Sequence, residues 1–133
     1  MRILVAIDSS ECSFTALSYA LDFYEMGGVE LDVVHVTDFK TDATEALVAK
    51  AREMLADAGI DTEPEVVTNL GLDTPKASVR VGQRIVELAT ERGADQIVVG
   101  RHGETGMLEK IILGSTSETV VKGAEIPVTV IPA

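Results

Sequence analysis

Five short apolar runs recur along the chain, and a longer amphipathic segment separates each run from the next. The runs are rich in valine and isoleucine, and the first and fourth show no alternation with polar residues. Continuous apolar runs of this length are typical of strands that are covered on both faces in a parallel sheet. We therefore predict strands at residues 3–7, 31–36, 65–70, 96–99 and 127–131.

The segments between the runs carry apolar residues at helical spacing. Leu17, Leu21 and Tyr24 fall on one stripe of the first segment. Two further stripes are formed by Leu47, Ala51, Met54, Leu55 and Ala58, and by Val81, Ile85, Leu88 and Ala89.

Glycine, threonine and proline mark where the predicted helices begin and end. Thr74 and Pro75 are typical of an N-cap followed by proline at the first helical position. Gly82 falls inside the third stripe, where we interpret it as a tolerated interior glycine. Glycines follow the stripes where helices should end, at Gly27, Gly28, Gly59, Gly93 and Gly123.

The order β-α-β-α-β-α-β-α-β predicts one three-layer, doubly wound α/β domain over residues 1–133, with five parallel strands and four helices. Right-handed crossovers place the carboxyl ends of all parallel strands at one edge of the sheet, where ligands of such folds bind. Asp8, Val36 and Gly100 close the first, second and fourth runs, so we expect them to face one crevice.

A glycine-rich segment follows the fourth run and precedes the last predicted helix. Gly100 and Gly103 lie at its start, and Gly114 and Ser115 lie at its end. Free amides at a helix N-terminus bind anions, and glycine lets the backbone approach a phosphate closely. The alternative is that these glycines only satisfy turns.

Two polar segments have both a structural and a functional interpretation. Ser115 and Glu118 match a capping box, which needs no ligand, although a serine at a helix start can also contact a phosphate. The Asp8 carboxylate could accept hydrogen bonds from a ribose hydroxyl or an adenine amine, or support a metal ion. It could equally help Ser9 and Ser10 to cap the first helix.

Composition narrows the function classes. The 133 residues carry 22 acidic and 11 basic side chains, for a net charge of −11, and show no basic patch, which argues against nucleic-acid binding. No apolar run reaches the roughly 18 residues of a membrane span, and residues 1–8 fit a first strand better than a signal peptide. A single cysteine excludes an internal disulfide and favours a reducing cytoplasm.

Catalytic and metal-binding motifs are missing from the sequence. His35 and His102 have no cysteine or carboxylate at metal-ligand spacing, which argues against a zinc site. The chain has no nucleophile-elbow pattern and no phosphate-loop lysine. Binding is therefore favoured over catalysis, and any hydrolysis is expected to be slow.

Taken together, these segments resemble the universal stress protein family over essentially the whole chain. The resemblance is carried by residues 3–11, 34–36, 98–117 and 126–131. It implies a sheet of strand order 3-2-1-4-5, a homodimer formed through the last strand, and a role in stress response. Some members of the family bind ATP and others bind no nucleotide. If this chain binds a nucleotide, we expect a Mg or Mn ion to accompany it.

The residues that match the family's nucleotide motif can be carried over individually. Asp8 and Val36 would hold the adenosine of a bound ATP or related nucleotide. The ribose and phosphates would be lined by Val99, Gly100, Gly103, Gly114, Ser115 and Thr116. Ten residues separate Gly103 from Gly114, where the nucleotide binders have nine. An interaction module of the same fold that binds no nucleotide is the alternative function.

Overall fold

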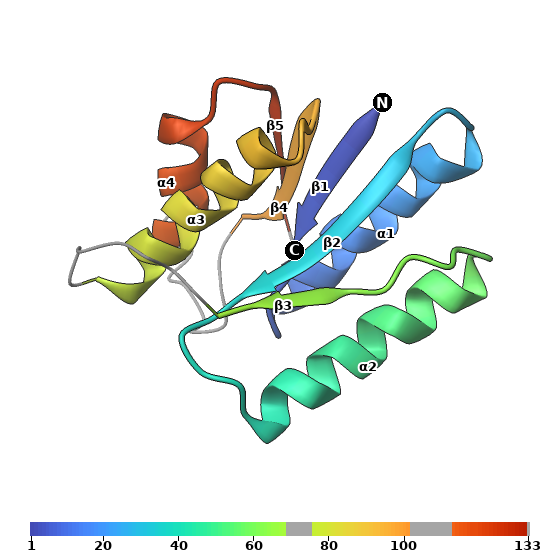
Figure 1. Ribbon diagram of the computed structural model, residues 1–133, viewed down its shortest axis with the longest axis horizontal. Coiled ribbons are helices and arrows are strands. Elements are labelled where there is room, and N and C mark those ends of the chain that lie inside the picture. Colours follow the sequence, from blue (N-terminus) through green and yellow to red (C-terminus); the bar gives the residue numbers. More distant parts are fainter. Residues whose placement is uncertain (69–75, 102–112, 133) are drawn as a thin grey trace.

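Five parallel strands form one sheet in the order β3-β2-β1-β4-β5, as a computed structural model that describes residues 1–68, 76–101 and 113–132 shows (Figure 1). Four helices connect the strands, and the predicted α/β fold class and strand order are confirmed. The strands are β1 (Arg2–Ala6), β2 (Glu30–Val36), β3 (Glu65–Val67), β4 (Gln96–Gly100) and β5 (Val128–Ile131). The helices are α1 (Glu11–Glu25), α2 (Asp42–Asp57), α3 (Ala77–Glu91) and α4 (Ser115–Gly123).

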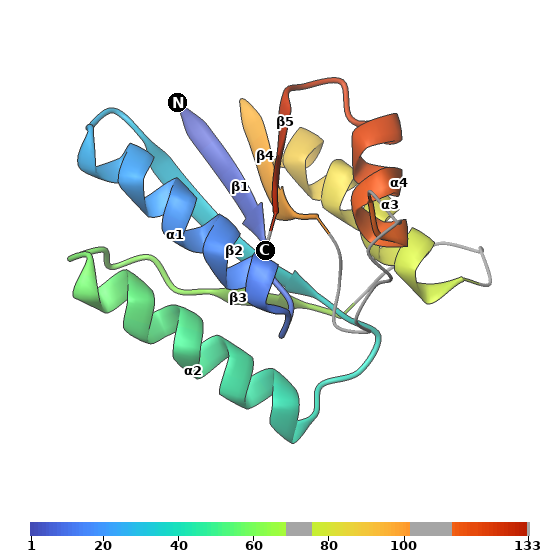
Figure 2. The same ribbon diagram turned by 180° about the vertical axis from the view of Figure 1, so that it is seen from behind.

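The helices cover both faces of the sheet and create two cores. Alternate side chains of each strand point to opposite faces. Ile3 and Val5 of β1 pack with α1 and α2, whereas Leu4 packs with α3 and α4. The two helix pairs lie on opposite sides of the sheet, as the reverse view also shows (Figure 2). Burial on both faces explains the unbroken apolar runs of β1 and β4.

The ends of the elements correct several predictions. β3 ends at Val67, so the predicted strand is too long at Thr68, and residues 69 and 70 lie outside the described residues. The predicted cap at residues 74 and 75 also lies outside them, and α3 begins at Ala77 with Lys76 as its N-cap. Gly59 and Gly93 do end helices, with φ of +76° and +65°, which favours glycine.

The side chains of β2 that face α3 are charged at the amino end of the strand and apolar at its carboxyl end. Glu30 and Asp32 lie at its amino end, whereas Val34 and Val36 lie in the core at its carboxyl end. Arg2 of β1 pairs with both carboxylates, at 2.7 Å to Glu30 and 3.4 Å to Asp32. The hydrogen bond to Glu30 and the two negative charges raise the pKa of Arg2. Charged residues thus occupy the part of this face near the amino ends of the strands.

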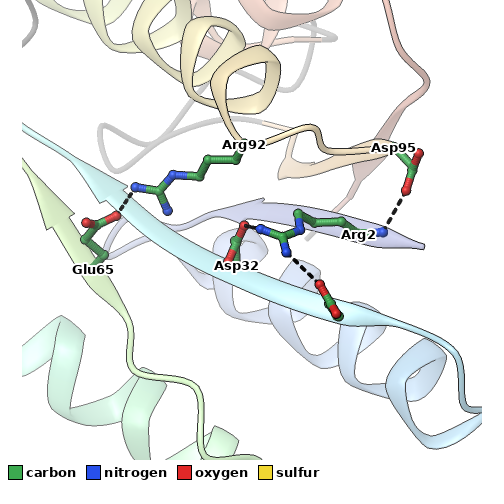
Figure 3. Close-up of polar contacts among 6 residues, drawn as sticks. Arg2, Asp32, Glu65, Arg92 and Asp95 are labelled. Atoms are coloured by element: carbon green, nitrogen blue, oxygen red, sulfur yellow. Dashed lines mark hydrogen bonds and ion pairs between the residues drawn. The ribbon is translucent and has the colours of Figure 1, made fainter.

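A backbone contact of Arg2 completes the polar network at this edge of the sheet, and a separate ion pair is drawn beside it (Figure 3). The backbone N–H of Arg2 donates to the Asp95 carboxylate at 2.8 Å, which ties β1 to the start of β4. Arg92, just after α3, pairs with Glu65 of β3. The contacts of Arg2 thus hold the amino edge of the sheet, whereas the Arg92–Glu65 pair joins the α3–β4 turn to the start of β3, which lies level with Val34 of β2.

None of the helices within the described ranges is both long and apolar enough to cross a membrane.

Candidate functional site

The carboxyl ends of β1, β2 and β4 meet at one edge of the sheet, opposite the polar network. The parallel register aligns Ala6 of β1 with Val34 of β2 and Val99 of β4. A pocket of about 60 Å³ opens beside these strand ends. Five of the eight predicted site residues line it, namely Asp8, Val36, Val99, Gly100 and Thr116.

Of the three other predicted site residues, two do not line the pocket and one lies outside the described residues. Gly114 is buried at the N-cap of α4, and Ser115 follows it as the first helical residue; neither is among the residues that line the pocket. Gly103 lies outside the described residues, as does His102.

Asp8 holds the turn between β1 and α1. Its carboxylate Oδ1 accepts a hydrogen bond from the Ser10 backbone N–H at 2.8 Å and a second one from the Ser10 hydroxyl. Ser10 is the N-cap of α1, and its hydroxyl oxygen accepts from the Ser13 N–H at 3.3 Å. The Asp8 N–H in turn donates to the Ser13 hydroxyl at 2.7 Å. The structural interpretation of Asp8 is therefore confirmed, and the same residue also lines the pocket.

Gly100 is the point where β4 touches α1 and α4. A Cβ at this position would lie 2.7 Å from Cys12 Sγ and 2.9 Å from the Ser13 nitrogen, closer than real side-chain contacts. The Ser117 hydroxyl donates to the Gly100 carbonyl at 2.6 Å. The glycine thus makes room for the first turn of α1, a reason that neither the phosphate nor the turn interpretation contained.

Within the described residues, no side chain caps the first turn of α4. Gly114 occupies the N-cap position, its N–H donates to the Arg101 carbonyl at 2.8 Å, and its own carbonyl accepts from Glu118 N–H at 2.9 Å. The three amides between them, at Ser115, Thr116 and Ser117, precede the first intrahelical bond. Thr116 and Ser117 line the pocket, so this uncapped helix end faces it.

The predicted capping box at Ser115 and Glu118 is wrong. Ser115 is already helical, so its side chain is not at the N-cap, and its carbonyl accepts from the Thr119 hydroxyl at 2.8 Å. Glu118 instead pairs with Lys122 at 2.7 Å. The hydrogen bond and charge of Lys122 lower the pKa of Glu118, and the charge of Lys76 lowers it further.

Helix α3 supplies a wall of the pocket that the sequence interpretation missed. Val81 and Ile85 line it, opposite the strand ends. Their apolar stripe was visible in the sequence, but a stripe does not tell which of its members reach a ligand site. Nearby, Arg80 pairs with Asp38 at 2.6 Å, which links the start of α3 to the segment that follows Val36.

Arg101 brings a positive charge to the end of β4. Its Nε atom is buried and has no hydrogen-bond partner within the described part of the chain. A buried donor of this kind normally has an acceptor, because leaving it unpaired is costly. Arg101 is not among the residues that line the pocket.

His35 has a structural contact at the same edge. Its Nδ1 lies 2.8 Å from the Ile7 carbonyl oxygen, and the ring is buried. Because a carbonyl oxygen can only accept, Nδ1 carries the proton. In the described ranges, no group of three or more histidine, cysteine, aspartate or glutamate side chains could hold a metal ion.

Comparisons with known proteins identify the family. The model of the Universal stress protein family matches residues 1–132. A universal stress protein of Methanocaldococcus jannaschii is 28% identical over 149 residues, which cover 98% of this chain and 81% of that protein.

Solved structures share the fold. The universal stress protein of Archaeoglobus fulgidus in complex with dAMP superposes with a TM-score of 0.73 at 24% identity, covering 98% of this chain and 97% of that one. A universal stress protein in complex with cAMP gives a TM-score of 0.74 at 23% identity, with 99% and 96% covered. With its fold, its strand order and the match over residues 1–132 in agreement, the chain belongs to the universal stress protein family.

Proposed function

We propose that this protein binds an adenine nucleotide, ATP or a relative of it, at the carboxyl edge of the sheet and acts in a stress response. The observation that carries the proposal is the uncapped N-terminus of α4, which faces the pocket with Thr116 and Ser117. A phosphate at this end would accept hydrogen bonds from the free amides and be favoured by the helix dipole. Arg101, which follows β4, adds a positive charge at the same edge.

The nucleoside would lie against the strand ends. Val36 and Val99 offer an apolar wall, and the Asp8 carboxylate offers an acceptor for a ribose hydroxyl or the adenine amine. The dAMP and cAMP complexes support the proposal in one respect: they demonstrate that this fold can hold an adenine nucleotide. Gly103 would join the phosphate side, as the family resemblance implies.

The size of the pocket bears on how a nucleotide would lie. Ligand pockets commonly have volumes of roughly 300–1,000 Å³, whereas this one has about 60 Å³. The pocket would therefore receive only part of the ligand, and the rest would lie across its mouth. A Mg or Mn ion would enter with the phosphates, with Asp8 as the acidic side chain on the wall.

Thermal unfolding tests the proposal directly. A ligand that binds only the native state, at a hundredfold excess over its Kd, stabilises it by about 2.7 kcal/mol, which raises the melting temperature by several degrees. We expect this shift with AMP or with ATP and magnesium at millimolar concentration. An absent shift with every adenine nucleotide would favour the interaction module that binds no nucleotide.

Two glycine-to-valine variants on α4 test whether the nucleotide binds at the proposed site. Gly114→Val places a branched side chain at the start of α4 and should remove the nucleotide-dependent shift. Gly123→Val is the matched control, because Gly123 is exposed at the other end of the same helix. If Gly114→Val keeps the full shift, the phosphates bind elsewhere.

We also propose that the protein forms a homodimer through β5. This strand lies at the edge of the sheet, and an unpaired apolar edge promotes association. Hydrogen bonds from Ile97 N–H to Pro127 and from Arg101 N–H to Ile131 indicate that the odd-numbered residues of β5 face β4. Val130→Pro therefore removes an outward N–H and spares these bonds. Sedimentation should show a dimer for the natural chain and a monomer for the variant.

A further inference from the structure

Gly82 lies in the middle of α3, at the place where α3 meets α4. A Cβ at this position would lie 2.6 Å from Thr119 Cβ and 2.9 Å from the Thr116 carbonyl oxygen. Real Cβ atoms do not approach other atoms this closely, so the two helices touch here through backbone. Glycine lowers helix stability relative to alanine, and the close approach of α4 gives a physical reason for its presence.

The residues that Gly82 contacts lie in the first and middle turns of α4. Thr116 is the second residue of the helix, and its hydroxyl also donates to the Ser78 carbonyl of α3 at 3.0 Å. At the other end of α4, a Cβ on Gly123 would lie 3.6 Å from Val86 Cγ2, an ordinary van der Waals distance. Of the two glycines in this helix pair, Gly82 thus has the tighter surroundings, and its contacts include the second residue of α4.

We infer that Gly82 is a positioning residue that fixes where the free amides of α4 lie relative to Asp8 and Val36. This inference rests on the proposed function. A methyl group at position 82 must push Thr116 and Thr119 away, and the first turn of α4 moves with them. A ligand that bridges the strand ends and α4 then loses contacts at its phosphate, whereas a nucleoside without phosphate keeps all of its contacts.

The experiment compares AMP with adenosine on matched alanine variants. Gly82→Ala should weaken AMP binding about tenfold, the loss expected for one charge-assisted hydrogen bond, and leave adenosine binding unchanged. Gly123→Ala makes the same substitution at the same helix pair and should change neither affinity. Isothermal titration calorimetry on the full chain gives both dissociation constants.

Each result decides one of the two proposals. Gly82→Ala with unchanged AMP affinity, or with equal losses for AMP and adenosine, overturns the positioning role while nucleotide binding stands. A natural chain that binds neither AMP nor ATP with magnesium overturns the proposed function itself, and the positioning role with it. The ratio of the two affinities also separates positioning from a general loss of stability, which would weaken both ligands.

A second variant covers the case in which Gly82→Ala does not fold. Gly82→Ala combined with Thr119→Gly removes the contact with the Thr119 side chain and leaves the contact with the Thr116 carbonyl oxygen. This double variant should bind AMP more weakly than Thr119→Gly alone, with adenosine affinity equal in both. Equal AMP affinities would overturn the inference.

Discussion

The two edges of the sheet use polar groups in opposite ways. At the amino edge, Arg2 meets two carboxylates of β2, so the chain neutralises its own charges, and Arg92 of the adjoining α3–β4 turn likewise pairs with Glu65 at the start of β3. At the carboxyl edge, the start of α4 has no side-chain cap, and Arg101 Nε has no partner in the part of the chain that the structure describes. Donors that the chain leaves unused are what a bound anion requires.

The contrast separates structural polar residues from candidates for function. Groups satisfied within the chain hold strands together, and their loss should alter stability alone. Groups at the carboxyl edge should alter ligand binding when changed, with or without a loss of stability. The following substitutions test this division, beginning with the largest expected effect.

The glycines at the two edges should respond to substitution for different reasons. Gly100→Ala should lower the free energy of unfolding by about 1–3 kcal/mol, because its Cβ would meet Cys12 Sγ at 2.7 Å. At the amino edge, Gly93 has a φ of +65°, and a Cβ there would meet no atom within 4 Å, so its constraint is the backbone angle. Thermal or urea unfolding measures both.

Substitution by asparagine distinguishes the backbone-angle constraint at Gly93 from the steric constraint at Gly100. Asparagine tolerates the left-handed conformation, so Gly93→Asn should cost less than Gly93→Ala. At Gly100 the order should reverse, because the larger side chain overlaps more with α1. The same order at both positions would mean that the close approach of α1 does not limit residue size at Gly100.

Asp8 combines both kinds of role, and two substitutions separate them. Asp8→Ala should cost about 1 kcal/mol, because the carboxylate oxygen that accepts from Ser10 is lost. Asp8→Asn keeps an oxygen at that position and should cost less. Both variants should bind nucleotide more weakly, as measured by calorimetry. If Asp8→Asn binds nucleotide like the natural chain, the carboxylate charge does not contact the ligand.

Breaking an ion pair at the amino edge should have a small effect on stability and none on binding. Arg92→Gln removes the pair with Glu65, whose side chain is 51% exposed. Such exposed pairs contribute about 0–1 kcal/mol, and salt screens them. The difference in melting temperature between variant and natural chain should shrink in 1 M salt. A reduced nucleotide affinity would show that the two edges are coupled.

The smallest effect is expected at Glu118, on α4 but on its exposed side. Lys122→Met should return the pKa of Glu118 toward its ordinary value of 4.5, because Lys122 lowers it in the folded state. A lowered folded pKa stabilises the protein above the ordinary value, and this stabilisation is lost as the pH falls through the folded pKa. Carboxyl chemical shifts followed by NMR during a pH titration measure the change. An unchanged pKa would contradict the pairing.

The architecture could be predicted from the sequence because each apolar run is local information. β1 and β4 lie within one residue of their predicted ends, since both are buried on both faces. The stripe with Ile85 and Leu88 likewise marks the buried face of α3. Helix starts were harder: Ser115 and Glu118 match a capping box, yet the helix begins one residue earlier than that pattern requires.

The roles of Gly82 and Gly100 could not be predicted from the sequence. Gly82 and Gly100 are explained by atoms of Thr119 and Cys12, which are distant in sequence. No local pattern distinguishes such a residue from a tolerated glycine or a turn glycine, because the reason lies in tertiary contacts. The pocket wall formed by Val81 has the same origin, since only the packing of α3 brings it to the strand ends.

The pocket draws its walls from segments that lie far apart in the chain. Ile3 pairs with Gln96, and Ile97 pairs with Val128, so these contacts close very long loops of chain. Residues from the first and final thirds of the chain line the pocket. Partial unfolding of either part would therefore remove the pocket. A molecule seated there would act as a noncovalent cross-link between distant segments. We therefore expect bound nucleotide to slow cleavage by proteases that attack partly opened chains.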